Sequence, residues 1–210
     1  MSLESNKILG GIGALLMVIS LVGLFGTAYV GFLLIVGAIL VLIALKGLAD
    51  YYQDGGIFNN ALYGFITVIV GIVAAIAIFI MMVLNLLASI EIDWTNPMAV
   101  QQYFMSHMET VWSIAGYGFG ALVVFFIAMI VSAILIRKSL DSLSKHSGEK
   151  IFGTAGMVWL IGAVLTIILI GIIVIWISWI LVAVGFFSIK PSQAQPPPAM
   201  IQPPPQPPPP

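Results

Sequence analysis

Long apolar runs separated by short polar segments dominate the pattern along the chain. Four of these runs contain no Asp, Glu, Lys or Arg, and together they hold 140 of the 210 residues: 8–45, 55–90, 110–136 and 151–189. A membrane-spanning helix needs about 20 apolar residues to cross roughly 30 Å of hydrocarbon. The pattern therefore predicts an all-α protein whose helices form a polytopic transmembrane bundle.

The first run is long enough for two spans. They are expected at about 8–25 and 29–45, as a tight hairpin with Gly23, Gly26 and Thr27 at its turn. Glycine suits such a turn because it has no Cβ to restrict its backbone. This run therefore predicts the first two crossings.

The second and third runs each hold one span, at about 62–87 and 111–136. Asn59 or Asn60 is expected to cap the start of the third span, because an Asn side chain accepts a hydrogen bond from the first free backbone N–H groups of a helix. The Arg-Lys pair at 137–138 is expected to stop the fourth span.

The last run supports two interpretations. Trp159 lies 17 residues before Trp176 and 20 before Trp179, the separation of two interfacial aromatic belts on one helix, which favours five spans in total. A single helix, however, would leave almost half of this run outside the hydrocarbon. Burial of that apolar surface, at about 25 cal/mol per Å², outweighs the placement of two indoles. We therefore predict six spans, the last two at about 152–170 and 172–189, with five as the alternative.

The two predicted hairpins are alike in sequence. Lys7 and Lys46 flank the first run 39 residues apart, and Lys150 and Lys190 flank the last run 40 residues apart. Two explanations stand side by side: an internal repeat of one hairpin, or the general similarity of glycine-rich apolar segments.

The basic residues predict the orientation of the chain. With six spans, all seven Lys and Arg residues fall on one side of the membrane, and Glu91, Asp93 and Glu109 lie in a loop on the other side. Cytoplasmic loops carry the excess of Lys and Arg. We therefore expect a multi-pass protein of the cell membrane with both termini in the cytoplasm, whereas five spans would place Lys190 and the tail outside.

The external loop contains the start of a helix. Asn96 is a good cap, and Pro97 suits the first helical position. Val100, Phe104 and Met108 then repeat every four residues, which predicts a short helix that either lies on the membrane or runs straight into the fourth span. Aromatic residues near the span ends are expected as interfacial anchors: Tyr51, Tyr52, Trp94 and Trp112.

Small residues spaced four apart let transmembrane helices approach closely. They predict helix-packing contacts, within the bundle or between protomers, for three pairs: Gly10 with Ala14, Gly71 with Ala75, and Gly116 with Gly120.

The last twenty residues have a different composition from the rest. Eleven of residues 191–210 are proline, which lacks the backbone N–H and cannot continue a helix. We expect a transmembrane domain over 1–190 and a disordered proline-rich tail over 191–210. Proline runs bind aromatic-lined grooves, so two alternatives remain: docking of a proline-recognising protein, and a free solvated tail.

Composition excludes several function classes. Apolar residues make up 61% of the chain and charged residues 7%, the net charge is −1 and cysteine is absent. No basic surface is available for nucleic acid, and thiolate metal sites and a Cys nucleophile are excluded. The predicted span cores contain no ionisable residue, which argues against proton-coupled transport. The hydroxyl side chains in these spans, such as Ser20, Thr67 and Ser178, are expected to bond to their own helix backbone.

No catalytic, cofactor-binding or metal-binding residue is therefore predicted, and no cofactor. Asp50 and Asp54, at positions i and i+4, are the carboxylates nearest the lipid headgroups. Paired carboxylates can perform acid–base chemistry when their pKa values are pushed apart. Solvated loop charges are the alternative, and we favour that interpretation. His107 with Glu109, Glu91 and Asp93 is a candidate metal site, but we interpret these residues too as solvated loop charges.

Short polar motifs carry a family resemblance. The segments KGLADYY at 46–52, IFNNALYG at 57–64 and FFSI at 186–189 resemble a family of multi-pass membrane proteins, mostly archaeal, known only as a domain of unknown function. The resemblance covers about residues 7–190. It implies the membrane fold but no activity, so no functional residue is carried over.

The sequence by itself reveals no biochemical activity. We expect a non-enzymatic scaffold or membrane-organising protein with a cytoplasmic proline-rich docking tail. The alternative is a passive channel or small-molecule carrier without intramembrane titratable groups. The expected partners are the lipid bilayer, a second copy of the chain in a homo-oligomer, and a proline-recognising protein that binds 191–210.

Overall fold

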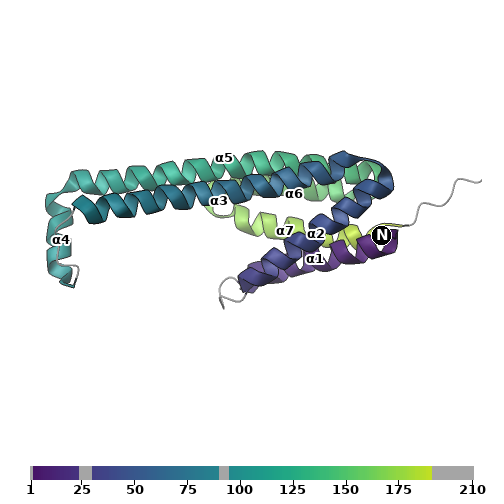
Figure 1. Ribbon diagram of the computed structural model, residues 1–210, viewed down its shortest axis with the longest axis horizontal. Coiled ribbons are helices and arrows are strands. Elements are labelled where there is room, and N and C mark those ends of the chain that lie inside the picture. Colours follow the sequence, from purple (N-terminus) through teal and green to yellow (C-terminus); the bar gives the residue numbers. More distant parts are fainter. Residues whose placement is uncertain (1, 24–29, 90–94, 191–210) are drawn as a thin grey trace, which may run out of the picture.

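The computed structural model describes residues 2–23, 30–89 and 95–190, which are helical apart from short connections (Figure 1). The elements of this described part are α1 (Leu3–Gly23), α2 (Val30–Tyr52), α3 (Gly55–Ser89), α4 (Pro97–Ser106), α5 (Met108–Ser147), α6 (Ile151–Leu165), the 3-10 turn η1 (Thr166–Ile168) and α7 (Gly171–Ser188). All but α4 belong to the six segments long and apolar enough to cross a membrane, and η1 extends α6 to form the fifth of them. The all-α prediction is confirmed, and so are the predicted six helices of membrane-spanning length and hydropathy. The predicted turn at Gly26 and Thr27 and the proline tail lie outside the described residues.

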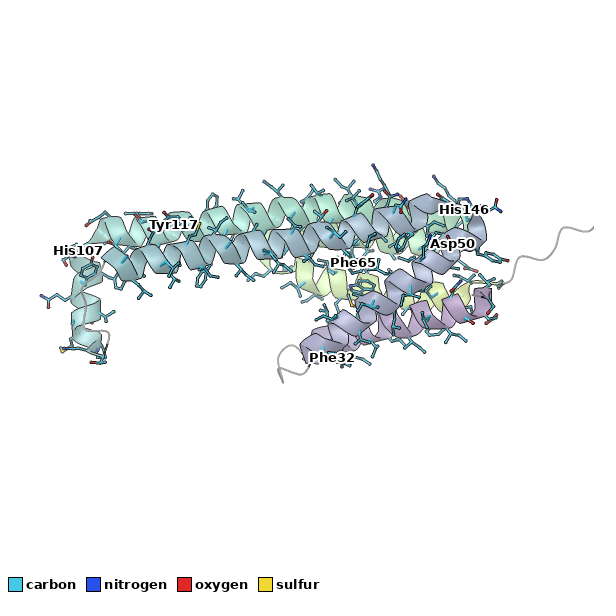
Figure 2. The ribbon with its side chains drawn as sticks, in the orientation of Figure 1. Phe32, Asp50, Phe65, His107, Tyr117 and His146 are labelled. Carbon is cyan, nitrogen blue, oxygen red and sulfur yellow. The ribbon has the colours of Figure 1, made fainter. Side chains whose placement is uncertain are left out.

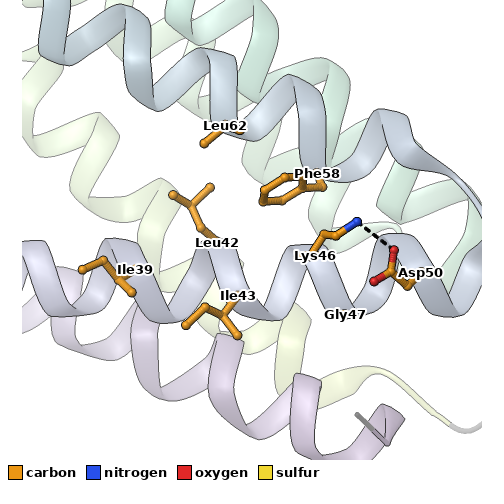
Figure 3. A pocket seen from close by; sticks show the side chains of 8 residues that line it. All are labelled: Ile39, Leu42, Ile43, Lys46, Gly47, Asp50, Phe58 and Leu62. Carbon is orange, nitrogen blue, oxygen red and sulfur yellow. Dashed lines mark hydrogen bonds and ion pairs between the residues drawn. The ribbon is translucent and has the colours of Figure 1, made fainter.

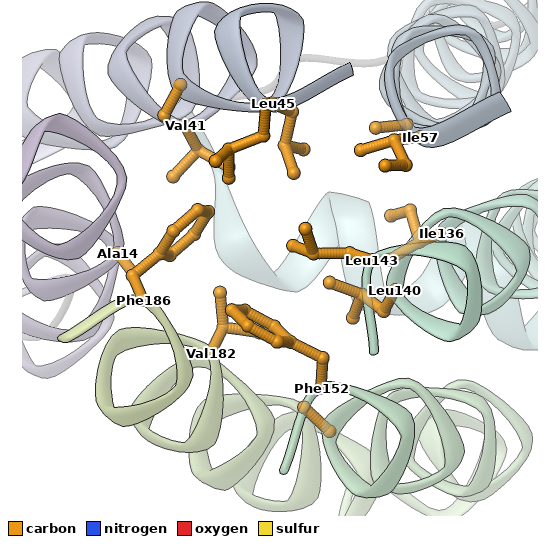
Figure 4. Close-up of a cluster of buried hydrophobic side chains, with 14 of the residues drawn as sticks. Ala14, Val41, Leu45, Ile57, Ile136, Leu140, Leu143, Phe152, Val182 and Phe186 are labelled. Atoms are coloured by element: carbon orange, nitrogen blue, oxygen red, sulfur yellow. The ribbon is translucent and has the colours of Figure 1, made fainter. Parts of the chain in front are cut away.

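The six long helices form a closed ring. Each packs on the next along the chain, with α3 on α5 across the α4 segment, and α7 returns to pack on α1. α1, α3 and α6 run away from the end that holds the N-terminus, and α2, α5 and α7 run back toward it. Every neighbouring pair in the ring is therefore antiparallel. The centre of the ring is filled by apolar side chains that include Leu143, Phe152, Val182 and Phe186 (Figure 4). This packing makes the bundle one solid core.

The helices of the ring differ greatly in length. α3 has 35 residues and α5 has 40, so at 1.5 Å per residue they are roughly 50 and 60 Å long. The other four have 15 to 23 residues. Figure 1 shows α3 and α5 continuing side by side well past the far ends of α1, α2 and α7. The bundle therefore has six helices at one end and only two at the other.

The aromatic-belt argument for five spans is wrong. Trp159 and Trp179 lie on two antiparallel helices, α6 and α7, and their rings meet edge to face at 4.9 Å in the core. The chain reverses between them at Leu169, whose φ is 64°, just before α7 begins at Gly171. The turn lies midway between the two tryptophans in the sequence, so the chain folds back and buries the two indoles side by side.

Two predicted helix boundaries also differ from the structure. α3 begins at Gly55, so Asn59 and Asn60 lie inside its first turns and cap nothing. α5 passes through the Arg-Lys pair at 137–138 and ends at Ser147. The residue that follows, Gly148, has the left-handed φ of 76° that favours glycine. The helix continues because Leu140 and Leu143 are buried in the core, and that burial outweighs the polar character of their neighbours.

The short helix in the loop begins as predicted. The Asn96 side chain accepts hydrogen bonds from the backbone N–H groups of Met98 and Ala99, with Pro97 at the first helical position. The chain then breaks at His107, and α4 lies across the far end of α3 and α5 (Figure 1). The alternative in which it runs straight into the fourth span is therefore wrong, and Met108 belongs to α5.

Candidate functional site

Charged residues gather at one end of the bundle. All seven Lys and Arg residues lie near the start of α1 or α6, near the end of α2 or α7, or in the C-terminal part of α5, and the antiparallel ring brings these segments together. Figure 2 shows Asp50 and His146 at this end and His107 at the opposite one. We call this part of the molecule the basic end.

The two carboxylates considered for acid–base chemistry have separate partners. Asp50 pairs with Lys46 at 2.9 Å, one turn earlier on α2, and its side chain is 65% exposed. Asp54 accepts a hydrogen bond of 2.8 Å from the Gly56 backbone N–H. Its other oxygen lies 3.6 Å from Nδ1 of His146. Asp50 thus serves a surface ion pair, whereas Asp54 caps α3, the role that the sequence assigned to the asparagines.

The Asp54–His146 contact also joins the α2–α3 corner to the end of α5. The His146 ring lies 5.8 Å from the ring of Tyr52. Of the two tyrosines predicted as interfacial anchors, Tyr51 is exposed and Tyr52 is half-buried against this corner. Tyr52 therefore has a packing role that its position in the sequence did not indicate.

A groove of about 380 Å³ opens between α2 and α3 near the basic end (Figure 3). Apolar side chains form most of its walls, and the Lys46–Asp50 pair stands at one end. The Lys46 ammonium also lies 5.5 Å from the centre of the Phe58 ring, within the range of a cation–π contact. The lining residues are Ile39, Leu42, Ile43, Lys46, Gly47, Asp50, Phe58 and Leu62.

The three predicted small-residue pairs lie in different surroundings. A Cβ on Gly10 would overlap the Phe186 ring of α7, and Ala14 is fully buried. A Cβ on Gly71 would overlap Ala128 of α5, with Ala75 half-buried one turn later. These two glycines lie where helices approach closely.

Gly116 and Gly120 lie on the part of α5 that extends beyond the ring. Apart from the surrounding turns of α5 itself, no atom of the described residues lies within 4 Å of a Cβ built on either of them. Trp112, one turn earlier, is 72% exposed, as suits an interfacial anchor, and Trp94 lies outside the described residues. Gly116 and Gly120 therefore take no part in packing this bundle. Of the two contacts predicted for this pair, only the one between protomers remains.

Polar side chains inside the bundle follow the backbone-bonding prediction only in part. The hydroxyls of Ser20 and Thr67 donate to carbonyls one turn back on their own helices. Ser178 instead donates to the Ala155 carbonyl of α6 at 2.8 Å, and Ser139 of α5 donates to the Ile57 carbonyl of α3. These hydroxyls join neighbouring helices.

The structural roles of two further polar side chains were not predicted from the sequence. The Trp176 indole N–H donates to the Val18 carbonyl at 3.0 Å and joins α7 to α1. Asn6 is fully buried against Gly47, where α1 meets α2. Neither amide atom of Asn6 has a hydrogen-bond partner among the described residues. The sequence held no signal of this burial, because asparagine is mostly exposed in proteins.

The described residues contain no group of three or more His, Asp or Glu side chains that could hold a metal ion. His107 stacks on the Tyr103 ring at 4.1 Å, which places it in the corner between α4 and α5. Glu91 and Asp93, its other predicted neighbours, lie outside the described residues.

Comparison with known proteins gives two matches. The model of a family described as protein of unknown function (DUF996) matches residues 33–180, from α2 into α7. An uncharacterized protein of Methanocaldococcus jannaschii, MJ1644, is 31% identical over 190 residues, which cover 90% of this chain and 94% of the relative. No solved structure matches the chain.

Proposed function

The chain belongs to the family described as protein of unknown function (DUF996). We propose that it has a non-enzymatic membrane-organising role. In this role the helical bundle anchors the protein in the cell membrane, and its basic end and proline tail hold other components at the cytoplasmic surface. The basic end carries the proposal, because it gathers every Lys and Arg of the chain beside both termini of the helical domain.

The orientation follows from the same observation. Lys and Arg are enriched on the cytoplasmic side of membrane proteins, so the basic end faces the cytoplasm. Lys190 ends the described chain at this face, and residues 191–210 therefore start there. A tail of twenty residues in polyproline II conformation reaches at most about 60 Å from the membrane surface, far enough to meet a peripheral protein.

Two observations favour this role over catalysis and conduction. The two carboxylates considered for acid–base chemistry, Asp50 and Asp54, are engaged in an ion pair and a helix cap. The ring centre is filled by Phe152, Phe186 and their neighbours (Figure 4), which supports a static bundle over a passive channel or carrier. A broad panel of solutes tested for flux in proteoliposomes should show none above empty vesicles.

The docking role is tested by changing the tail. The full chain, a variant lacking 191–210 and a variant of equal length with the tail prolines replaced by serine are purified from native membranes. Partners that need the proline conformation are lost from both variants, whereas partners that need only the tail's length are kept by the serine variant. An identical set of partners for all three proteins would overturn the docking role.

The orientation is tested separately by labelling. Because the chain has no cysteine, Ser192→Cys and Gln101→Cys each provide one reactive site. A membrane-impermeant maleimide added to intact cells should label Gln101→Cys on α4 and spare Ser192→Cys. The reverse pattern would place the tail outside and exclude a cytoplasmic partner.

A further inference from the structure

The groove between α2 and α3 has the dimensions of one lipid leaflet. Its lining on α2 runs from Ile39 to Asp50, eleven residues that rise about 16 Å. Half of a hydrocarbon core roughly 30 Å thick is about 15 Å. The groove therefore extends from the headgroup region at the basic end to about the middle of the bilayer.

The walls suit a hydrocarbon chain. Ile39 and Ile43 on α2 are 51% and 41% exposed, and Leu42 faces Phe58 and Leu62 across the groove (Figure 3). A volume of about 380 Å³ falls within the range of small-molecule sites. Both flanking helices are long and apolar enough to span the membrane, so the lateral opening of the groove faces lipid.

The charged end suits a headgroup with one positive and one negative group. Lys46 and Asp50 lie 2.9 Å apart with their side chains 55% and 65% exposed, so both keep hydrogen-bonding capacity for a ligand. An ammonium donates to phosphate oxygens, and a carboxylate accepts from a primary amine. The pair has no net charge, and a purely anionic headgroup would meet repulsion from Asp50.

We propose that this groove binds one amine-bearing zwitterionic phospholipid. One of its chains lies along Ile39, Leu42 and Leu62, its phosphate accepts hydrogen bonds from Lys46, and its primary amine donates to Asp50. A trimethylated amine cannot donate a hydrogen bond, so a choline headgroup binds less well. The inference is independent of the tail and of the proposed docking role.

Native mass spectrometry of the delipidated full chain in detergent tests the proposal. Phosphatidylethanolamine, phosphatidylcholine and phosphatidylglycerol with identical acyl chains are titrated separately. Phosphatidylethanolamine should give a first bound lipid at about tenfold lower concentration than the other two, as expected for one additional charge-assisted hydrogen bond. Equal binding of all three lipids would overturn the headgroup assignment.

Matched variants locate the site. Ile43→Trp fills the groove and should abolish binding of the preferred lipid. Ile35 lies two turns earlier on α2 and is also exposed, so Ile35→Trp should leave the lipid bound. Lys46→Gln should weaken binding about tenfold, whereas Lys138→Gln on α5 should not. Asp50→Asn should remove the preference for ethanolamine over choline.

All variants are first checked for an unchanged melting temperature and elution volume. The substituted groove residues are exposed or half-buried, so the fold should tolerate these changes. Unchanged binding by folded Ile43→Trp would place the lipid elsewhere and overturn the proposal.

Discussion

At the residue scale, the few polar side chains of this bundle hold several of its helix ends and helix contacts in place. Asp54 is the main example, because one carboxylate caps α3 and also contacts His146 of α5. Sequence reasoning assigned the cap to Asn59 or Asn60, which were nearer to the predicted start of the span. A cap depends on where the helix begins, and buried Ile57 and Ala61 extend α3 beyond its membrane segment.

The cap leads to a stability prediction. Asp54→Ala leaves the Gly56 N–H at the start of α3 without its acceptor and should lower the free energy of unfolding by about 1 kcal/mol. Asp50→Ala removes only an exposed i, i+4 ion pair and should cost about 0.5 kcal/mol or less. Thermal melts in one detergent compare the two variants, and equal shifts would contradict the capping role.

Replacement of glycine by alanine should change the stability in opposite directions at two glycines that both lie in apolar helices. A Cβ on Gly13 would lie 2.8 Å from the Gly37 carbonyl oxygen of α2, and backbone atoms cannot yield as a side chain would. Gly13→Ala should therefore destabilise the bundle, although alanine favours the helix by about 1 kcal/mol.

Gly116→Ala is the matched control. Its Cβ would meet no described atom, so helix propensity alone should raise stability by about 1 kcal/mol. Chemical or thermal unfolding measures both variants. A loss of stability in Gly116→Ala, together with a smaller particle on size-exclusion chromatography, would reveal a contact between protomers at this glycine.

At the element scale, α3 and α5 are much longer than α6 and α7. This difference in length determines how deep in the membrane each helix ends. Gly156 of α6 packs on Arg137 of α5. From that level α6 rises nine residues to Leu165, about 14 Å, whereas α5 extends 28 residues to Glu109, about 42 Å. A bilayer with its headgroups is roughly 40–45 Å thick, which matches α5 and leaves the α6–α7 turn more than 20 Å short of Glu109.

The composition of that turn agrees with a position inside the membrane. Ile167 and Leu169 are 72% and 74% exposed, and the Thr166 hydroxyl donates to the Gly162 carbonyl of its own helix. A backbone within lipid must form its hydrogen bonds internally, and a tight turn comes close to that requirement. We therefore expect lipid around this turn.

Labelling tests the depth of the turn. In right-side-out vesicles, Leu169→Cys should resist a membrane-impermeant maleimide, whereas Gln101→Cys on α4 should react. After solubilisation in denaturant both should react fully, which shows that the thiols are intact. Comparable labelling of the two sites before solubilisation would place the turn at the outer surface.

At the scale of the whole molecule, the contact between the first and last helices closes the ring. The Trp176 indole donates to Val18 across this seam, and Phe186 packs against Gly10. The family model begins at residue 33, after α1, so the helix that completes the core lies outside the matched region. The relative from Methanocaldococcus jannaschii matches 90% of the chain.

The seam gives a further prediction with its own control. Trp176→Phe keeps an aromatic ring but removes the donor to Val18, and should cost about 1 kcal/mol, within the range of hydrogen bonds between membrane helices. The same change at exposed Trp112 should leave the unfolding free energy unchanged. Equal melting temperatures of wild type and Trp176→Phe would mean that the hydrogen bond adds no stability.

The sequence by itself determined the membrane class, the six helices, the start of α4 at Asn96 and the gathering of basic residues on one side. These features follow from hydropathy, capping and charge, which act over one helix or less. Only the tertiary structure decided that Trp159 and Trp179 form one pair, that Gly10 is packed while Gly116 is not, and that Lys46 and Asp50 stand at the end of a groove. Each of these depends on residues brought together by ring closure, such as Trp176 and Val18, which are 158 positions apart. Uniformly apolar helices carry little local signal to show which of their faces will meet.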